Sequence, residues 1–585
     1  MKKLSLRGKI SIVFIGLLMI ILIIVLMRPS HRTYYIASSS PTLVLQKVEN
    51  NKITDETVEV VRGTIVKEKY HQKDQFIVIS HQGDEEVQLA VSQDHLVDNQ
   101  NQVVLTDKVY ARLLVNLRES KNGDITDQVL ERYEAVEVKS IDYENDFHSD
   151  TGEVDGYTIT KDGHDYYVLS RYVEESLELA KKDYSGSIAY STYWDGVFEK
   201  GYSKETYIGS IDYKPVDKMN YEDNPLKGNI NAVHVGMSLL SKQSDDLIDL
   251  CKESGINALV LEMKNDVGCI AYQSESVKKY LKDTSQAFRQ AMDKEEMKKL
   301  IEKYKKEDIY LIARIVTFKD PIFASQWKDA AILNQDGSLL SHDGIYWPSA
   351  YSREAWRYNV ALAKETAQMG FNEIQFDYVR FPDGLSQKEI SHRIEFNNTY
   401  GENKVQAIQR FLMYAYDELS PQHVYVGADV FGWPAVAKDD QNIGQFIPAI
   451  SNVVDVISPM PYPDHFGANS LGIVQPWQEP EETLSRYSQL YIDIQNSIPS
   501  PALYRSWIQG YACLSYVCTG TPDNPERSYN SQDMIAQIKG IQSAGFEGYM
   551  VWSGEGKMEM FEYRKAGFID SKLEEGQKFE HTYIE

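Results

Sequence analysis

The segment GFNEIQFDYVRFP, residues 370–382, decides the fold that we predict for most of the chain. Its glycine is typical of the end of a helix, and the apolar run after it is typical of a buried strand. Within this run Ile374 and Phe376 share one side, while Gln375 and Asp377 share the other. Asp377 comes where the strand is about to end. This alternation predicts that the Ile374 and Phe376 side of the strand packs against helices. The side that carries Gln375 and Asp377 then faces away from those helices.

The same rhythm continues through the chain from residue 229 onward. Short apolar strands alternate with helical segments, which is the order of parallel βα units. The predicted strands are 232–236, 258–264, 310–316, 373–381, 425–433, 455–462, 505–511 and 548–555. The predicted helices are 241–254, 294–305, 353–369, 403–419, 481–497 and 531–544. We therefore predict an α/β fold, a (β/α)8 TIM barrel over residues 228–575, with a long insertion at 317–352.

Polar residues occur at the positions that face the interior of this barrel, where a purely structural barrel would carry aliphatic side chains. They are His234, Glu262, Lys264, Arg314, Gln375, Asp377, Asp429, Gln509 and Glu555. Glu262 and Lys264 either neutralise each other or contact a substrate, and Arg314 is expected to hold a carboxylate. Asp377 is the strongest candidate for chemistry, because active sites of such barrels form where the strands end.

Aromatic side chains give a second indication. Seven of the eight tryptophans lie in the predicted barrel, and Trp433 and Trp552 lie where strands end. Flat rings suit the apolar faces of pyranose sugars, although they can also serve only to pack loops. Combined with the carboxylates, they favour a sugar ligand.

Motif absences narrow the chemistry further. The sequence has no phosphate loop, no dinucleotide fingerprint, no His-x-His on the first strand and no Gly-x-Ser-x-Gly elbow. We predict no metal and no organic cofactor. A carboxylate-based hydrolase remains, and glycosidic bonds require one protonated and one ionised carboxyl group. Nearby rings can raise one pKa by desolvation, and Arg314, Lys264 or Arg380 can lower the other.

Four segments together carry a resemblance to a known family. They are residues 370–382, GADVFGW at 427–433, ISPMPYP at 457–463 and GYMVWS at 548–553. Over about residues 228–570 the chain resembles a bacterial TIM-barrel family described as "putative glycosyl hydrolase domain". The family is similar to barrels of the α-glycosidase type.

The resemblance implies roles for particular residues. An Asp at the end of the fourth strand serves as nucleophile in such barrels, and this role maps onto Asp377. The acid/base would be Asp429 by analogy with one clan and Asp464 by analogy with another, and Glu555 is a third candidate. Asp429 is the first choice, and the assignment stays open. The expected substrate-binding residues are Glu262, Lys264, Arg314, Arg380, Trp433, Tyr462, Gln509 and Trp552.

Residues 10–27 form an uncharged, largely apolar stretch preceded by lysines and an arginine in residues 1–9. This stretch predicts a single-pass transmembrane helix in the cell membrane, with a cytoplasmic tail at 1–9 and the remainder extracytoplasmic. A cleaved signal peptide, which would make the protein secreted, is the alternative.

A linker at 28–41 and a β-rich region at 42–225 are predicted between this helix and the barrel. Short alternating runs and polar turns indicate strands there, and residues 157–172 faintly resemble an SH3-like strand pair. The region is expected to be a spacer or to contact the cell wall.

Charge and cysteine content limit the partners. With 61 basic and 86 acidic residues the net charge is −25, which argues against a nucleic-acid ligand. Cys513 and Cys518 could pair outside the cell, and the sequence leaves this open. We predict a membrane-anchored glycoside hydrolase acting on a cell-surface or environmental polysaccharide. The alternatives are a non-catalytic polysaccharide-binding barrel and an envelope scaffold.

Overall fold

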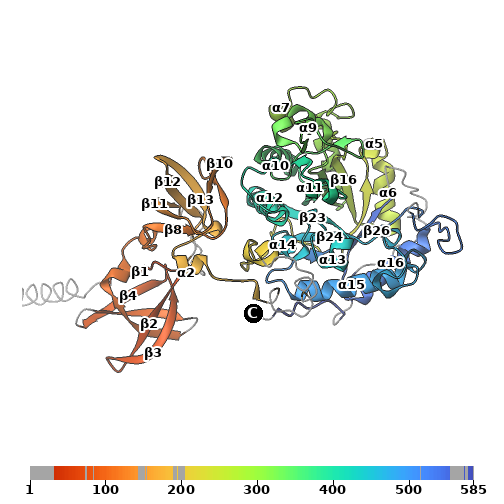
Figure 1. Cartoon of the computed structure of the whole chain (residues 1–585). Coiled ribbons are helices and arrows are strands. Elements are labelled where there is room, and N and C mark those ends of the chain that lie inside the picture. Colours follow the sequence, from red (N-terminus) through yellow and green to blue (C-terminus); the bar gives the residue numbers. More distant parts are fainter. Residues whose placement is uncertain are drawn as a thin grey trace, which may run out of the picture. The chain divides into compact units, whose positions relative to one another are not determined.

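The computed structural model describes most of the chain after residue 31. The described residues are 32–72, 75–82, 85–142, 152, 154–186, 188, 194, 205–240, 242–513, 516–553, 572–573 and 577–583. They belong to two compact units, Met1–Lys182 and Asp183–Glu585 (Figure 1). The predicted membrane helix at 10–27 lies outside the described residues. Within them, no helix combines the length and the apolar composition that a membrane crossing requires.

The first unit is built from two seven-stranded antiparallel sheets, so the predicted β-rich region is confirmed. The strands of the first sheet are β1 (Thr33–Ile36), β2 (Thr42–Glu49), β3 (Lys52–Val61), β4 (Ile65–Gln72), β5 (Gln75–Gln82), β6 (Glu85–Ser92) and β7 (Leu96–Val97). The strands of the second are β8 (Lys108–Ala111), β9 (Val115–Arg118), β10 (Ile125–Leu130), β11 (Ala135–Asp142), β12 (Gly156–Lys161), β13 (His164–Leu169) and β14 (Val173–Glu174). The expected strand pair at 157–172 is the hairpin of β12 and β13.

A buried ion pair connects the two sheets of this unit. Arg62, at the end of β3, donates to Glu175 at 2.6 Å, next to β14, and both side chains are almost fully buried. The Tyr157 hydroxyl of β12 donates to the same carboxylate at 2.8 Å. Because a buried charge is costly without a partner, these contacts fix the two sheets against each other.

The second unit contains a nearly closed barrel of parallel strands, as predicted. Its strands are β15 (Asn231–Val235), β16 (Ala258–Lys264), β17 (Tyr310–Val316), β21 (Glu373–Asp377), β23 (Tyr425–Phe431), β24 (Val456–Met460), β25 (Leu503–Tyr504), β26 (Ser506–Gln509) and β27 (Tyr549–Trp552). Arg505 alone separates β25 from β26. β25 pairs with β24, and β26 pairs with β27. Together β25 and β26 therefore act as one interrupted strand between β24 and β27.

Helices surround the strands (Figure 1). The principal ones are α6 (Ser244–Ser254), α8 (Lys294–Lys306), α10 (Arg353–Ala367), α12 (Lys404–Leu419), α15 (Pro480–Asn496) and α16 (Ser531–Ser543). Shorter helices are α2 (Leu177–Ala180), α5 (Met237–Leu240), α7 (Glu275–Tyr280), α9 (Pro321–Gln326), α11 (Ser386–Ile390), α13 (Trp433–Ala437) and α14 (Ile447–Ser451). Two short ribbons, β18 (Leu333–Asn334) with β22 (Ile394–Glu395) and β19 (Ser341–His342) with β20 (Ile345–Tyr346), complete the loops.

The sequence explains where two of the long helices begin and end. Asn403 caps α12, because its side chain accepts from the backbone of Gln406 while the Gln406 side chain accepts from the backbone of Asn403. Gly370 follows α10 with φ of 103°, which only glycine adopts easily, and turns the chain into β21. The predicted alternation of helices and strands is therefore set by local residues.

Polar side chains fill the part of the barrel interior near the beginnings of the strands. At the start of β21, Glu373 forms an ion pair with Arg505 at 2.7 Å, and neither side chain is exposed. Gly427 of β23 lies against this pair, since a Cβ there would be 2.9 Å from Glu373 Oε1. Gln375, two residues after Glu373 on β21, donates through its side-chain amide to the Ser458 hydroxyl of β24 at 3.4 Å. The polar side of the 373–377 strand therefore faces the interior, as predicted.

Residues 205–225, which the sequence pattern places in the β-rich region, pack on the barrel instead. Lys218 donates to the backbone carbonyls of Asn452 at 3.0 Å and Val454 at 2.8 Å, just after α14. The Tyr221 backbone N–H donates to the Tyr425 hydroxyl at 3.2 Å, at the first residue of β23. The compact units divide after Lys182 rather than near residue 225. The packing of this segment on the barrel could not be predicted, because the segment is polar and contains no long apolar run.

Candidate active site

Arg314 organises the upper end of the barrel. It lies on β17 and donates through Nε to Asp377 of β21 at 2.9 Å, and through Nη1 to Glu262 of β16 at 2.8 Å. Its guanidinium carbon also lies 5.0 Å from the centre of the Trp552 ring on β27. Arg314 itself is buried. One cation therefore joins two carboxylates from the strands on either side of it.

Asp377 ends β21, and its carboxylate has partners on both oxygens. Arg314 donates to Oδ2, and the backbone N–H of Tyr378 donates to Oδ1 at 2.6 Å. Tyr378 makes this contact with φ of 48°, a left-handed conformation that is unfavourable for a bulky residue. Strain of this kind persists only where the surroundings enforce it, and it is concentrated at functional sites. The Asp377 side chain is 9% exposed.

Asp429 lies next to Asp377 on the neighbouring strand. Phe376 of β21 pairs with Ala428 of β23. The next residue on each strand is an aspartate, so Asp377 and Asp429 lie side by side. Trp507 donates through Nε1 to Asp429 Oδ1 at 2.7 Å. Asp429 is completely buried. Burial, reinforced by the negative charge of Asp377, raises the pKa of Asp429 well above its usual range.

Glu262 is the more exposed carboxyl of the site, with 15% of its side chain accessible. Burial raises its pKa, and the positive charge of Arg314 opposes this shift. His234 of β15 has Nε2 at 3.8 Å from Glu262 Oε1, and its ring packs 4.3 Å from that of Trp552. Burial and Arg314 lower the pKa of His234 well below its usual value, so its imidazole is neutral.

Lys264 does not pair with Glu262, contrary to the inward orientation that we expected. The register of β16 shifts between Glu262 and Lys264, which turns the lysine toward the helix layer. There it forms a fully buried ion pair with Asp320 at 2.8 Å and donates to Asn359 of α10 at 2.8 Å. Its role is thus to join the barrel to α9 and α10.

The other predicted binding residues fall into two groups. Arg380 packs among rings, 4.2 Å from Phe431, and donates to the Phe381 carbonyl at 2.9 Å. Burial lowers its pKa. Tyr462 is buried in one apolar cluster with Trp507, against which Trp552 packs. These contacts place Tyr462 and Trp552 beside the carboxylates and Arg380 among aromatic side chains.

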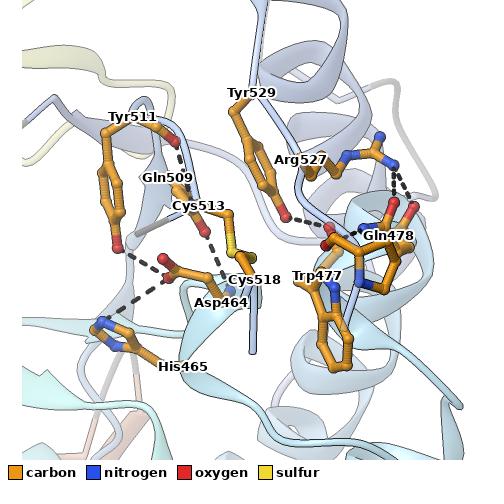
Figure 2. Close-up of a disulfide and its surroundings, with 11 residues drawn as sticks. Asp464, His465, Trp477, Gln478, Gln509, Tyr511, Cys513, Cys518, Arg527 and Tyr529 are labelled. Atoms are coloured by element: carbon orange, nitrogen blue, oxygen red, sulfur yellow. Dashed lines mark hydrogen bonds and ion pairs between the residues drawn. A yellow bond between two sulfur atoms is a disulfide. The ribbon is translucent and has the colours of Figure 1, made fainter. Parts of the chain in front are cut away.

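Asp464 lies in a separate polar cluster, close to Cys513 and Cys518 (Figure 2). The Tyr511 hydroxyl donates to its carboxylate at 3.0 Å, and the Gln509 side chain accepts from its backbone N–H at 3.2 Å. Asp464 is 1% exposed. The two cysteines form a disulfide, which settles the pairing that the sequence left open.

Two predicted residues remain to be placed. Trp433 begins α13 and is 42% exposed, directly after β23. Glu555 lies outside the described residues, as does the chain from 554 to 571. In the part of the chain that is described, no group of three or more His, Cys, Asp or Glu side chains is arranged to hold a metal ion.

Several residues of this site give no recognisable signal in the sequence. The contact of Trp507 with Asp429 could not be predicted, because no local pattern links residues 78 positions apart. The left-handed Tyr378 also escaped notice, since tyrosine gives no signal for that conformation. Asp320, the partner of Lys264, lies in the long insertion after β17. Each of these contacts joins distant segments.

Comparison with known proteins gives a family. Residues 232–557 match the family model described as "Putative glycosyl hydrolase domain". A hypothetical protein from Ruminiclostridium thermocellum is 30% identical, over 34% of this chain and 97% of its own, with a TM-score of 0.29. No curated protein matches the chain.

Two further solved structures are more distant in sequence. The glycoside hydrolase domain of PgaB (BpsB) from Bordetella bronchiseptica is 11% identical, over 58% of this chain and 99% of its own, with a TM-score of 0.42. An alpha-L-fucosidase from Paenibacillus thiaminolyticus is 9% identical, over 58% of this chain and 48% of its own, with a TM-score of 0.37.

Proposed function

Because this chain belongs to the family of "putative glycosyl hydrolase domains", we propose that its barrel hydrolyses glycosidic bonds through a pair of carboxyl groups. The observation that carries the proposal is the arrangement around Arg314. Two carboxylates of different exposure and environment converge on this one guanidinium at the end of the barrel strands. Glycoside hydrolysis requires one ionised and one protonated carboxyl group at such a position.

Asp377 is the nucleophile in this proposal. Its ion pair with Arg314 and the N–H of Tyr378 stabilise the negative charge and fix the direction of the oxygens. One carboxylate oxygen attacks the anomeric carbon while the glycosidic C–O bond breaks. The departing oxygen needs a proton at the same moment, and that proton comes from the second carboxyl group.

We assign the proton transfer to Glu262, although Asp429 was our first choice from the sequence. Both have a raised pKa, which favours the protonated form that a general acid needs. A general acid must reach the oxygen that it protonates, and Glu262 is partly exposed whereas Asp429 is completely buried. Asp429 then serves as a positioning residue beside Asp377, held by the indole N–H of Trp507.

The direct test is hydrolysis of a panel of soluble polysaccharides and oligosaccharides by the wild-type protein and by Asp377→Asn. We expect the wild type to release new reducing ends and Asp377→Asn to lose at least about a thousandfold in kcat, since the nucleophile is removed. Equal thermal unfolding of the two proteins, followed by circular dichroism, is the control. Undiminished hydrolysis by Asp377→Asn would contradict the role, and substrate binding without any product would favour a non-catalytic binding barrel.

We further propose that the enzyme is held at the outer face of the cell membrane by residues 10–27. The support is the apolar stretch with basic residues before it. The two antiparallel sheets of the first unit would then lie between the membrane and the barrel in sequence order, as a spacer or as a contact with the cell wall.

A further inference from the structure

Three side chains are exposed on the loops that follow consecutive barrel strands. Trp433 is 42% exposed after β23, and Tyr516 is 70% exposed after β26. His465, in the short turn Pro463–His465 after β24, has 55% of its side chain accessible. We call these three residues the outer aromatic patch. Single exposed hydrophobic side chains are ordinary, whereas exposed aromatic side chains that are grouped on neighbouring loops are typical of a binding surface.

The three side chains are neighbours through one stretch of chain, residues 465–467. The ring of Trp433 lies 6.1 Å from that of Phe466. A Cβ on Gly467 would lie 3.5 Å from the Tyr516 hydroxyl. Trp433 and Tyr516 therefore flank the loop that carries His465.

The patch is also connected to the proposed catalytic residues. The ring of Tyr462 lies 5.1 Å from that of His465. Tyr462 in turn belongs to the apolar cluster against which Trp552 packs, beside Arg314. Tyr462 thus connects the loop that carries His465 with the apolar cluster beside the carboxylates.

The disulfide holds one end of this patch in place. Cys513 and Cys518 close a ring that carries Tyr516 (Figure 2 shows the two cysteines and their surroundings). Cys513 and Val517 pack with the buried Trp477, and the backbone N–H of Cys513 donates to the Arg527 carbonyl at 3.1 Å. The Tyr529 hydroxyl donates to the Trp477 carbonyl at 2.8 Å. A covalently closed and anchored ring restricts the positions that Tyr516 can adopt, which lowers the entropic cost of binding.

We infer that the outer aromatic patch binds sugar units remote from the scissile bond, so that the substrate is a long glycan chain rather than a short oligosaccharide. This inference rests on the proposed function and extends it to the class of substrate. Flat rings that stack on pyranose faces at a distance from the carboxylates contribute only when the glycan is long enough to reach both places. The affinity should therefore increase with chain length.

The test measures binding separately from hydrolysis. Affinity electrophoresis against a panel of neutral and amino-sugar polysaccharides identifies a glycan that the wild-type protein binds, and isothermal titration then follows oligosaccharides of it from two to eight sugars. We expect the wild-type affinity to rise with length. Trp433→Ala and Tyr516→Ala should each weaken binding of the longest oligomer about tenfold, roughly 1.4 kcal/mol, and leave the disaccharide unchanged.

Two controls separate the patch from general effects. Met219→Ala removes another exposed hydrophobic side chain, 48% accessible, near the opposite end of the strands, and should change nothing. Reduction of the disulfide should weaken long-chain binding by the wild type but not by Tyr516→Ala. Equal binding of long chains by wild type, Trp433→Ala and Tyr516→Ala would overturn the inference, and so would failure of the wild type to bind any glycan in the panel.

The outcomes also distinguish this inference from the proposed function. Length-dependent binding that needs Trp433 and Tyr516, without release of reducing ends, would support the patch and contradict the hydrolase. Hydrolysis that depends on Asp377 but is indifferent to both aromatic substitutions, at every chain length, would support the hydrolase and contradict the patch.

Discussion

At the scale of single residues, the site depends on how different environments act on similar carboxyl groups. Glu262 and Asp377 share Arg314, yet Asp377 also accepts from a backbone N–H while Glu262 is the more exposed of the two. Asp429 is completely buried, and its pKa is raised because burial and the negative charge of Asp377 act together. Residue type alone could not have separated these roles.

The acid role of Glu262 predicts a dependence on the leaving group. Glu262→Gln should slow cleavage of a natural glycosidic bond about a hundredfold or more, because the departing oxygen is no longer protonated. A dinitrophenyl glycoside of the same sugar, whose leaving group needs no proton, should keep nearly the wild-type kcat/KM, because this parameter reports the step that breaks the glycosidic bond. Steady-state kinetics with both substrates measure the difference, and Asp429→Asn is the comparison, since a positioning residue affects both substrates alike.

The same role fixes the direction of the pH dependence. The pKa of Glu262 is raised by burial, and the acid is active only while protonated, so kcat/KM should fall as the pH rises through that pKa. This alkaline decline should be seen when the wild type cleaves the natural glycosidic bond, and it should disappear when Glu262→Gln cleaves that same bond. An alkaline decline of unchanged position in this variant would assign the proton transfer to another group.

At the scale of elements, the barrel strands were predicted well because their pattern is local. An apolar run, a polar residue near its end and a glycine before it are all visible in the sequence, as in 370–382. The orientation of Lys264 was not predictable, because the irregular register between Glu262 and Lys264 leaves no trace in the sequence. The alternation along a strand predicts which of its residues face the barrel interior. It does not predict contacts between distant segments, such as those of Trp507 and Tyr516.

Close packing inside β23 predicts the effect of a small substitution. In Gly427→Ala the new Cβ would lie 2.9 Å from Glu373 Oε1, within the buried ion pair with Arg505. We expect the free energy of unfolding to fall by about 1–3 kcal/mol, as for other overpacked interiors. Urea denaturation followed by tryptophan fluorescence measures the change. An unchanged free energy of unfolding in Gly427→Ala would contradict this prediction, because it would mean that the Glu373–Arg505 pair can move aside without loss of stability.

At the scale of the whole molecule, the barrel needs a segment that precedes it. Tyr207 donates to Asp440 at 2.7 Å, and Lys218 and Tyr221 bond to residues around α14 and the start of β23. Composition suggested a boundary near residue 225, because this segment is polar. The contacts that it makes are long-range and were not visible in the sequence.

These contacts predict different stabilities for two fragments. The fragment 183–585 should unfold cooperatively, whereas the fragment 228–585 should be less stable by more than about 5 kcal/mol, because several large buried side chains are removed. Chemical denaturation of both fragments measures the difference. Equal midpoints would mean that residues 183–227 contribute nothing to the barrel.

The central claim is that Asp377 and Glu262 act on the two sides of one glycosidic bond. The most direct measurement is a crystal structure of Asp377→Asn soaked with a glycan that the wild-type protein cleaves. The account predicts a sugar whose anomeric carbon faces residue 377 and whose glycosidic oxygen lies within hydrogen-bonding distance of Glu262. A glycan bound far from both residues, or one whose glycosidic oxygen is contacted by Asp429 or Asp464 instead, would contradict it.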